Sequence, residues 1–383
     1  MMELQPINIE EPEWVTEKRK KALEIYTSLQ WPNLKYGTTI RADYSDLNTE
    51  NLSFGSAIVE LQFKHDEAIV LPLMEAARKL PELVKPYLFD YFEIKHKFHA
   101  LHAAYWTSGL FIYIPPNAEI EKPIIIDRKV LNNSIHHVLV VCGEGSNATV
   151  IEKHSSGGGQ QLFNSSAVEA IVKHGAKLTF ASVQNYGMNV FNFDDKIAHV
   201  EQDAKIEWLD FCFGSKFTHS NVESILNSSG AESKVNGLFF GDGEQQFDVG
   251  ARSIHAAPHT RSDIAGKGVL NGKAKAIYRG LVRIENEAPS SDGYQKEDVL
   301  MLSEEAEANS IPQLEIDNNE VKCSHAATTS HIDSDQLFYL MSRGIEKEEA
   351  TKLIVSGFFE SFIAQLPEAL ADEIRAHVEM RLC

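Results

Sequence analysis

Residues 175–211 read GAKLTFASVQNYGMNVFNFDDKIAHVEQDAKIEWLDF, and this stretch decides the fold. It contains two short runs of alternating apolar and polar residues, KLTFAS and KIEWLDF. Each run follows a turn residue and an alanine, Gly175-Ala176 in the first case and Asp203-Ala204 in the second. Alternation with a period of two is typical of a β-strand with one buried face. The stretch therefore predicts a strand-and-turn unit that occurs twice.

The same pairing of a turn residue with an alanine recurs along the chain. Its alanines are Ala118, Ala148, Ala176, Ala204 and Ala231, at spacings of 30, 28, 28 and 27 residues, with a looser copy at Ala274. Self-similarity at a nearly constant period indicates stacked repeats. Because the repeats contain strands, we expect a β-solenoid of about eight coils over residues 106–330. A jelly roll or sandwich also has short strands, but it does not explain the period.

The region before the solenoid, residues 1–105, has a helical pattern. Apolar residues recur at helical spacing in EKRKKALEIYTSL (17–29) and in AIVLPLMEAARKLPELVKPYLFD (68–90), with prolines as breaks. We therefore expect a mainly β chain whose solenoid begins after a helical N-terminal region.

The region after the solenoid, residues 331–383, is also predicted to be helical. Asp333 is a candidate N-cap for a first helix, Gly344 is a candidate C-terminal stop, and a third helix follows Pro367. These helices carry more apolar side chains than a short tail can bury alone. Part of that surface is expected to meet the solenoid or another protein.

Composition and charge exclude several kinds of partner. The net charge of −19 repels nucleic acid and anionic membrane surfaces. We found no secretion signal and no apolar run approaching the roughly 18 residues that span a bilayer. The four cysteines are far apart and form no CxxC pair. This pattern favours a reducing cytoplasm.

No motif for independent catalysis was found. The run GKGVLNGKAK (266–275) resembles a damaged phosphate-binding loop, but the spacing is wrong and Ala274 replaces the hydroxyl residue that binds Mg²⁺. His255 and His259 are four residues apart, and a strand would separate them by about 13 Å, so structural histidines are favoured over a metal pair. The sequence therefore predicts a protein that is not an enzyme.

Cys323 and His325 are the best candidates for metal ligands. They lie in VKCSHAATTSH (321–331), in the last predicted strand, where residues i and i+2 face the same side. A thiolate and an imidazole are both suited to iron or zinc. On the residues alone, a buried cysteine beside a hydrogen-bonded histidine is the favoured alternative. Two donors cannot complete a metal site, so a functional site would need donors from a second chain.

Four segments of the sequence resemble a known family, one of them weakly. VKCSHAATTSHIDSDQLFYLMSRGIEKEEATKLIVSGFF (321–359) is similar to the C-terminal signature of the SufB/SufD family of iron–sulfur cluster assembly proteins. IHAAPHTRSD (254–263) and FHALHAAYWTSGLFIYIPPNAEIEKPI (98–124) resemble further parts of the same family, and WPNLKYGTTI (31–40) does so weakly. The first segment is specific, and the others support it.

The resemblance implies a right-handed parallel β-helix between helical ends. It also implies pairing between SufB-like and SufD-like subunits through the C-terminal ends of their solenoids, with docking of the ATPase SufC on the C-terminal helices. ATP would then be hydrolysed only by that partner. A transient iron–sulfur cluster would form near the subunit interface, with no cofactor bound stably by this chain alone. Flavin is associated with assembled complexes of the family, but no flavin motif was found here.

Within the family, the sequence is SufD-like rather than SufB-like. Ala306 occupies the place where SufB-like chains carry a cysteine, whereas Cys323 and His325 belong to the CSH triplet of SufD-like chains. The resemblance carries the proposed role of interface cluster ligand onto His325, and with less support onto Cys323. Homodimers and heterodimers both remain open.

The resemblance also implies a docking surface for the ATPase. Its residues are Phe338, Tyr339, Arg343, Gly344 and Phe358. Aromatic and arginine side chains are frequent anchors of protein interfaces. Two alternatives stay open at this level: a carbohydrate-active β-helix enzyme, and a purely structural solenoid.

Overall fold

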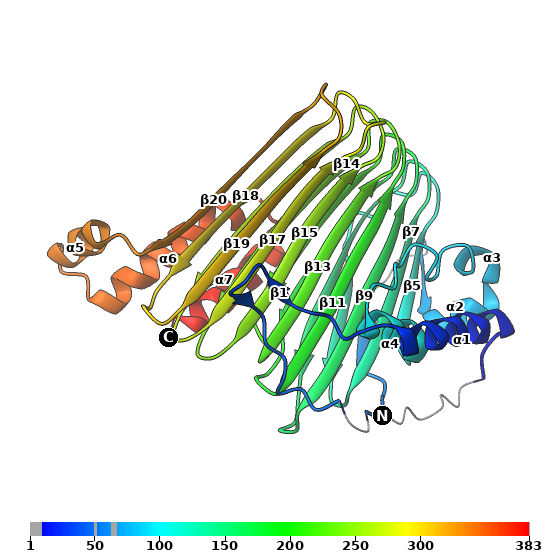
Figure 1. Cartoon of the computed structure of the whole chain (residues 1–383), viewed down its shortest axis with the longest axis horizontal. Helices are drawn as coiled ribbons and strands as arrows, with labels where there is room; N and C mark the ends of the chain where they lie inside the picture. The colour runs from blue at the N-terminus through cyan, green and yellow to red at the C-terminus, as the bar shows by residue number, and fades with distance from the viewer. Residues whose placement is uncertain (1–9, 50–51, 63–66, 383) are drawn as a thin grey trace.

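The computed structural model of the chain describes residues 10–49, 52–62 and 67–382, and it is mainly β. Two sheets of nine strands face each other along the length of the molecule, and helices lie at both ends of the chain (Figure 1). The expected solenoid flanked by helical regions is confirmed.

From β5 onward, strands alternate between the two sheets, so each coil contributes one strand to each sheet. The odd-strand sheet contains β5 Ser108–Ile114, β7 Ser134–Cys142, β9 Leu162–Val172, β11 Val190–Val200, β13 Phe217–Leu226, β15 Gln246–His255, β17 Lys275–Ile284 and β19 Glu307–Ile316. The even-strand sheet contains β6 Ile124–Val130, β8 Asn147–Ser156, β10 Lys177–Asn185, β12 Lys205–Cys212, β14 Glu232–Gly241, β16 Arg261–Leu270, β18 Asp292–Met301 and β20 Lys322–His331. All neighbours within these two sets are parallel, as in a stack of coils. Strands β5 to β20 make eight coils, the number predicted from the period.

Two short strands of the N-terminal region were not predicted. Strand β3 (Ile58–Gln62) pairs antiparallel with β6, and β4 (Ile69–Pro72) pairs antiparallel with β5. The prediction of helix from residue 68 onward is therefore wrong at its start. The apolar run that contains β4 is too short for its period to separate strand from helix.

The remaining N-terminal elements are mostly helical, as predicted. They are α1 Glu13–Ser28, α2 Leu73–Lys79, α3 Pro81–Val84 and α4 Lys97–Tyr105, with a two-stranded hairpin of β1 Lys35–Tyr36 and β2 Ile40–Arg41. The C-terminal helices are α5 Ser334–Ser342, α6 Lys347–Ile363 and α7 Glu368–Arg381. The Asp333 side chain accepts hydrogen bonds from the backbone of Asp335 and Gln336, which confirms the predicted N-cap.

The corner that precedes each even strand explains most of the sequence period. Backbone bonds join one small residue per coil to the next coil, for example Lys177 N to Ser146 O at 2.8 Å and Lys205 N to Ala176 O at 2.8 Å. The column contains Ala118, Ser146, Ala176, Ala204, Ala231, Thr260 and Ser291. Small side chains suit it because the chain turns inward there.

Two members of the predicted alanine series are outside this column. Ala148 lies inside strand β8, opposite Leu178, and Ser146 takes the corner position in that coil. Ala274 lies at the opposite corner, between β16 and β17. The period was therefore correct, but the assignment of these two alanines to the corner was wrong.

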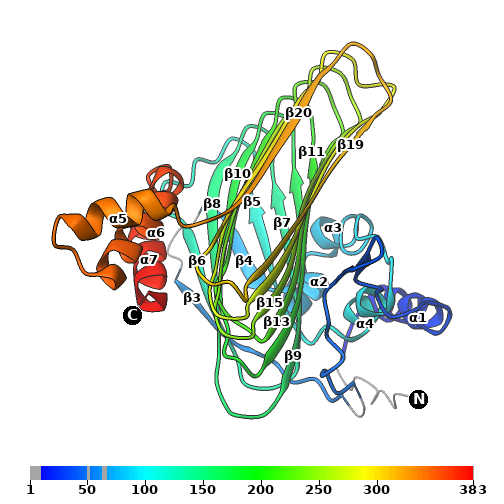
Figure 2. The ribbon, with the colours of Figure 1, turned by 60° about the vertical axis from the view of Figure 1, so that its left-hand side comes forward.

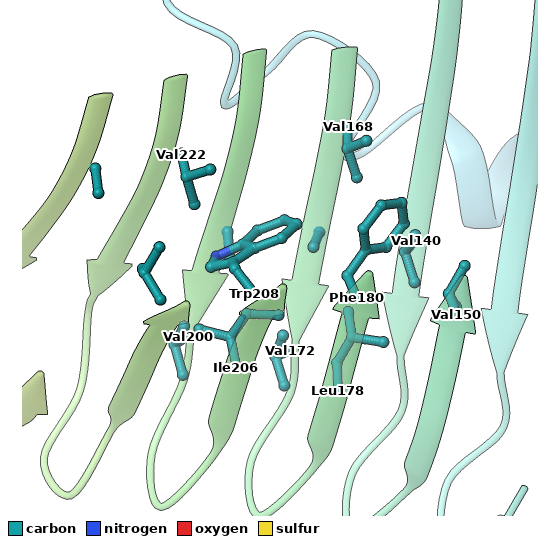
Figure 3. Packing of buried hydrophobic residues seen from close by; sticks show 14 of the residues in the cluster. Val140, Val150, Val168, Val172, Leu178, Phe180, Val200, Ile206, Trp208 and Val222 are labelled. Atoms are coloured by element: carbon teal, nitrogen blue, oxygen red, sulfur yellow. The ribbon is translucent and has the colours of Figure 1, made fainter. Parts of the chain in front are cut away.

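The space between the two sheets forms the main apolar core. Inward-facing side chains from both sheets interlock there, with Phe180 and Trp208 adjacent at a ring separation of 5.6 Å (Figure 3). Both side chains are fully buried. Burial of an aromatic side chain of this size contributes several kcal/mol, because truncation to alanine costs about 3–5 kcal/mol.

The helical regions cover opposite outer faces of the solenoid (Figure 2). The N-terminal region packs on the odd-strand sheet, where its Phe98 lies in the same apolar cluster as Phe193 of β11. Helices α6 and α7 pack on the even-strand sheet, where Phe359 and Ile374 contact the same apolar cluster as Phe211. None of the helices in the described part of the chain has the length and apolar character needed to cross a membrane.

Candidate functional site

The last coil leaves one strand exposed at the edge of each sheet. Strand β19 ends the odd-strand sheet and β20 ends the even-strand sheet. In β20, Lys322 N bonds back to Ser291 O at 3.0 Å, so the even-numbered backbone groups of this parallel strand face β18. The odd-numbered groups, from Cys323 to His331, face away from the solenoid and are free to pair with another strand.

Pro312 marks a difference between the two exposed edges. In β19, Glu307 N bonds to Ala274 O and Asp317 N to Ile284 O, so the odd-numbered groups face β17. Pro312 is even-numbered and therefore lies where its missing N–H would point out of the sheet. Proline is tolerated there because no ladder hydrogen bond is lost. The β20 edge has a full row of donors, whereas the β19 edge has one gap.

Cys323 and His325 lie on β20, on the face directed between the two sheets. Their partners on β18 are Gly293 and Gln295, which are both buried. Cys323 is half-buried and packs against the main core, and burial raises the pKa of its thiol. His325 is exposed, because no further coil covers this face. The register agrees with the shared face expected from the sequence, but only the imidazole is freely accessible.

Polar groups surround this open end. Glu297, on the same face of β18, accepts a hydrogen bond from the Ser310 hydroxyl of β19, and burial raises the pKa of its carboxyl to about 8. Among the described residues, no set of three or more His, Cys, Asp or Glu side chains is arranged to hold a metal ion. Any metal held by Cys323 and His325 would need further ligands from outside the chain.

The predicted docking residues divide into two groups. Phe338 and Tyr339 lie on α5 with 72% and 57% of their surfaces exposed, and Arg343 lies over the Tyr339 ring at 5.2 Å. Gly344 ends this helix with a positive φ of 87°, as predicted for a C′ glycine. Phe358 is separate from them: it lies on α6, half-buried beneath the Lys267 ammonium at 4.6 Å. Helix α5 has no fully buried residue, and its two aromatic side chains are exposed.

A polar cavity on the odd-strand sheet was missed by the sequence analysis. It has a volume of about 470 Å³ and lies between the N-terminal region and strands β11 to β17. Its floor is a hydrogen-bonded network: His99 Nε2 contacts Asp195 at 3.1 Å, Asn221 donates to Asp195 at 2.8 Å, and Arg279 donates to Asn221 and Asp248 at 2.7 and 2.6 Å. Burial would raise the pKa of Asp195, but the neighbouring His99 holds it well below its usual range.

The N-terminal region contributes the roof of this cavity. Tyr36 donates to Asp248 at 2.8 Å, while the tilted rings of His96 and His99 have their centres 3.6 Å apart. Burial lowers the pKa of His96 to about 3, so its imidazole is neutral at pH 7. A signal for this network does exist in the sequence. Asp195 and Asn221 are register partners in adjacent coils, as are His219 and Asp248, so they share columns at the repeat period.

The chain matches two family sequence models. Residues 124–358 match the SufBD core domain, described as SUF system FeS cluster assembly, and residues 49–126 match the SufBD protein N-terminal region. The first match spans the solenoid from β6 onward together with α5 and part of α6.

Curated relatives carry the same family description. An iron–sulfur cluster assembly SufBD family protein of Staphylococcus haemolyticus is 28% identical, over 97% of this chain and 90% of the relative. Proteins of the same description from Staphylococcus saprophyticus and Staphylococcus epidermidis are 32% and 33% identical. These matches cover 83% and 75% of this chain, and 70% and 63% of the relatives. Since the core-domain match alone covers more than half of its length, the chain belongs to the SufBD family of iron–sulfur cluster assembly proteins.

Proposed function

We propose that this chain is the SufD-like, non-catalytic subunit of an iron–sulfur cluster assembly complex. It pairs with a SufB-like subunit through the open end of the solenoid, docks a SufC-type ATPase on α5 and contributes His325 to a nascent cluster. The observation that carries the proposal is the last coil, which has two unpaired strand edges and an uncovered inward face. The free thiols of the chain support a reducing compartment, the cytoplasm.

Strand addition is the natural way to close such an end. Strands β19 and β20 are each ten residues long, so a partner with two equivalent edges would continue both sheets. Main-chain hydrogen bonds would supply affinity, and side chains on the inward faces would supply specificity. A long exposed edge without a partner promotes aggregation, which favours a dedicated partner for this one.

The cluster is cargo that two subunits share. His325 offers an accessible imidazole at the open end, and the Cys323 thiol lies two residues away on the same face. Nitrogen and thiolate donors both ligate cluster iron. Because Cys323 and His325 supply only two donors, the SufB-like subunit must complete the ligand set.

Helix α5 presents the surface proposed for the ATPase. Phe338 and Tyr339 form an exposed aromatic pair next to Arg343, a combination typical of interface anchors. Phe358, half-buried on α6 beside the Lys267 ammonium, is a further proposed contact of the same partner. ATP hydrolysis would belong to the docked protein, since the 266–275 segment is part of strand β16, a turn and the start of β17.

The decisive experiment is reconstitution with a SufB-like and a SufC-like protein under anaerobic conditions. We expect His325→Ala to assemble the three-protein complex normally but to load much less iron and sulfide. The matched control is His331→Ala, because His331 is also exposed and lies on the same face of β20. Equal loading by the His325→Ala and wild-type complexes would refute the role of His325 as a cluster donor.

Docking of the ATPase is tested in the same system. Replacing Phe338 and Tyr339 by serine should abolish co-purification of the ATPase while pairing with the SufB-like subunit persists. Met380→Ser on α7 removes a comparably exposed side chain, at 61% exposure, and should have no effect. Retention of the ATPase by the double variant would show that α5 is not the docking helix.

A further inference from the structure

A row of inward-facing residues crosses the even-strand sheet from coil to coil. Successive register partners in this row are Glu152, Ser182, Asp210, Gly237, Gly266, Glu297 and Ala327. Two glycines thus lie side by side between two carboxylates. A glycine in the interior of a strand lowers the stability of that strand. Glycines at these two positions therefore indicate that the space beside them is used by another group.

The space at the two glycines is used differently. A Cβ atom at Gly266 would lie 2.7 Å from the ring of Tyr278, so this ring, which comes from β17 on the facing sheet, fills that position. A Cβ atom at Gly237 would meet only the backbone oxygen of Ala265, at 3.9 Å. The position next to Tyr278 is therefore open.

A small cavity lies there. Its volume is about 20 Å³, above the roughly 10–15 Å³ that one water molecule requires. Asp210, Cys212, Gly237 and Tyr278 are among its lining residues. Apart from these polar groups the lining is apolar, with Val222, Val235, Phe239 and Val249.

Two buried polar groups at this cavity lack hydrogen-bond partners. The Tyr278 hydroxyl has none, although only 4% of the surface of this residue is exposed. Asp210 Oδ1 lies 3.1 Å from the Lys196 ammonium but makes no hydrogen bond either. Burial raises the pKa of Tyr278, so its hydroxyl keeps its proton and is a donor.

We propose that the cavity beside Gly237 binds one water molecule, which accepts a hydrogen bond from Tyr278 and donates one to Asp210. The water joins a phenol of the odd-strand sheet to the buried ion pairs that Lys196 makes with Asp194 and Asp210. It thereby connects β11, β12 and β17 through the interior. Gly237 is the residue that keeps the site open.

The alternative is an empty cavity, and its energetics are unfavourable. The buried Tyr278 hydroxyl, without a partner, costs on the order of 1–3 kcal/mol. A bound water recovers most of this at a small entropic cost. A buried water usually makes about two to four hydrogen bonds. Tyr278, Asp210 and the Cys212 thiol would supply that number of partners.

The test uses the full-length chain and the variant Gly237→Ala, whose methyl group would enter the cavity without a backbone clash. If water is bound, the methyl displaces it and leaves the Tyr278 hydroxyl unsatisfied, so the melting temperature should fall by about 1–3 °C. If the cavity is dry, the methyl fills a void and the melting temperature should rise. Gly159→Ala, in a loop with nothing within 4 Å, measures the general effect of the extra methyl.

A second variant and a direct observation complete the test. Tyr278→Phe should lower the melting temperature alone but raise it in the Gly237→Ala background, because there it removes an orphaned hydroxyl. A crystal structure that resolves ordered water should show a density peak between Tyr278 and Asp210. Absence of that peak, or a higher melting temperature for Gly237→Ala than for the wild type, would overturn the proposal.

Discussion

The two ends of the solenoid are built from similar coils but finished in opposite ways. At the first coil, the short antiparallel strands β3 and β4 cover the edges of both sheets, and Pro72 ends β4. At the last coil, β19 and β20 carry no covering strand, and their inward-facing residues are half-buried or exposed. One end is thus closed by the chain itself, and the other remains open in the part of the chain that the structure describes.

The difference shows that an end is closed by the segments packed against it, because the coils themselves are alike. Inward residues of the first coil, such as Ile112, are fully buried, whereas their counterparts in the last coil, such as Leu314, remain half-buried. Antiparallel caps and prolines are common ways to protect sheet edges. The chain applies both at its first coil, but at its last coil only Pro312 interrupts one edge.

The largest expected effect is on the free energy of unfolding, when a core side chain is truncated at each of the two ends. Ile112→Ala should lower the free energy of unfolding by about 2–5 kcal/mol, because it leaves a cavity in a closed core. Leu314→Ala, on the same sheet at the other end, should cost the isolated chain roughly 1 kcal/mol or less, since the site is half-open. Urea unfolding measures both. Equal losses would mean that the last coil is as tightly packed as the first.

A proline scan of β20 separates pairing from folding. Ala327→Pro removes an N–H that faces the open end, so the chain should fold normally but bind a SufB-like partner at least about tenfold more weakly. Ala326→Pro removes an N–H that bonds to β18 and should destabilise the last coil itself. Partner affinity and thermal unfolding give the two readouts. Unchanged affinity in Ala327→Pro would place the partner elsewhere.

Acid should weaken the side that the N-terminal region covers. His199 packs against Tyr91 with ring centres 4.2 Å apart, and burial lowers its pKa to about 4. The unfolded chain binds a proton near pH 6.5 and the folded chain does not, so stability falls as the pH drops from about 6.5 to 4. His199→Gln should flatten this part of the urea midpoint profile. A profile as steep as that of the wild type would assign the loss to other histidines.

Raising the pH should act at the open end, with the opposite sign. Burial raises the pKa of Glu297 to about 8, so the folded chain holds a proton that the unfolded chain releases near pH 4.5. Stability from this group is complete below pH 4.5 and is lost as the pH rises towards 8. Glu297→Gln should remove that loss, whereas Asp298→Asn, at the adjacent position paired with Lys296, should only reduce it, because Asp298 contributes less than burial to the raised pKa of Glu297. Identical profiles for Glu297→Gln and the wild type would contradict the assignment.

Sequence periodicity predicted more of the fold than of the site. The solenoid, its eight coils, and the caps at Asp333 and Gly344 could all be predicted because each depends on local spacing. The strands β3 and β4 could not, since their pairing with β6 and β5 depends on contacts across the chain. Ala148 was assigned to the corner because its neighbour Asn147 also suits a turn, and only the register shows that Ser146 is there.

The candidate site likewise has features that spacing predicts and features that only the folded chain decides. Cys323 and His325 could be placed on one face from their spacing alone, but that the imidazole is exposed and the thiol is half-covered depends on the absence of a ninth coil. The cavity that contains His96, His99 and Asp195 could not be predicted, because its residues come from the N-terminal region and from several coils.

By itself, the sequence determined the repeat, the strands within it and the chemistry of the residues at the last strand, because each follows from the order of neighbouring side chains. Only the tertiary structure decided which end is closed, which side chains remain uncovered and where a cavity lies between two glycines and a tyrosine. These features depend on how close distant segments come, and burial is a property of the stacked coils rather than of any one of them.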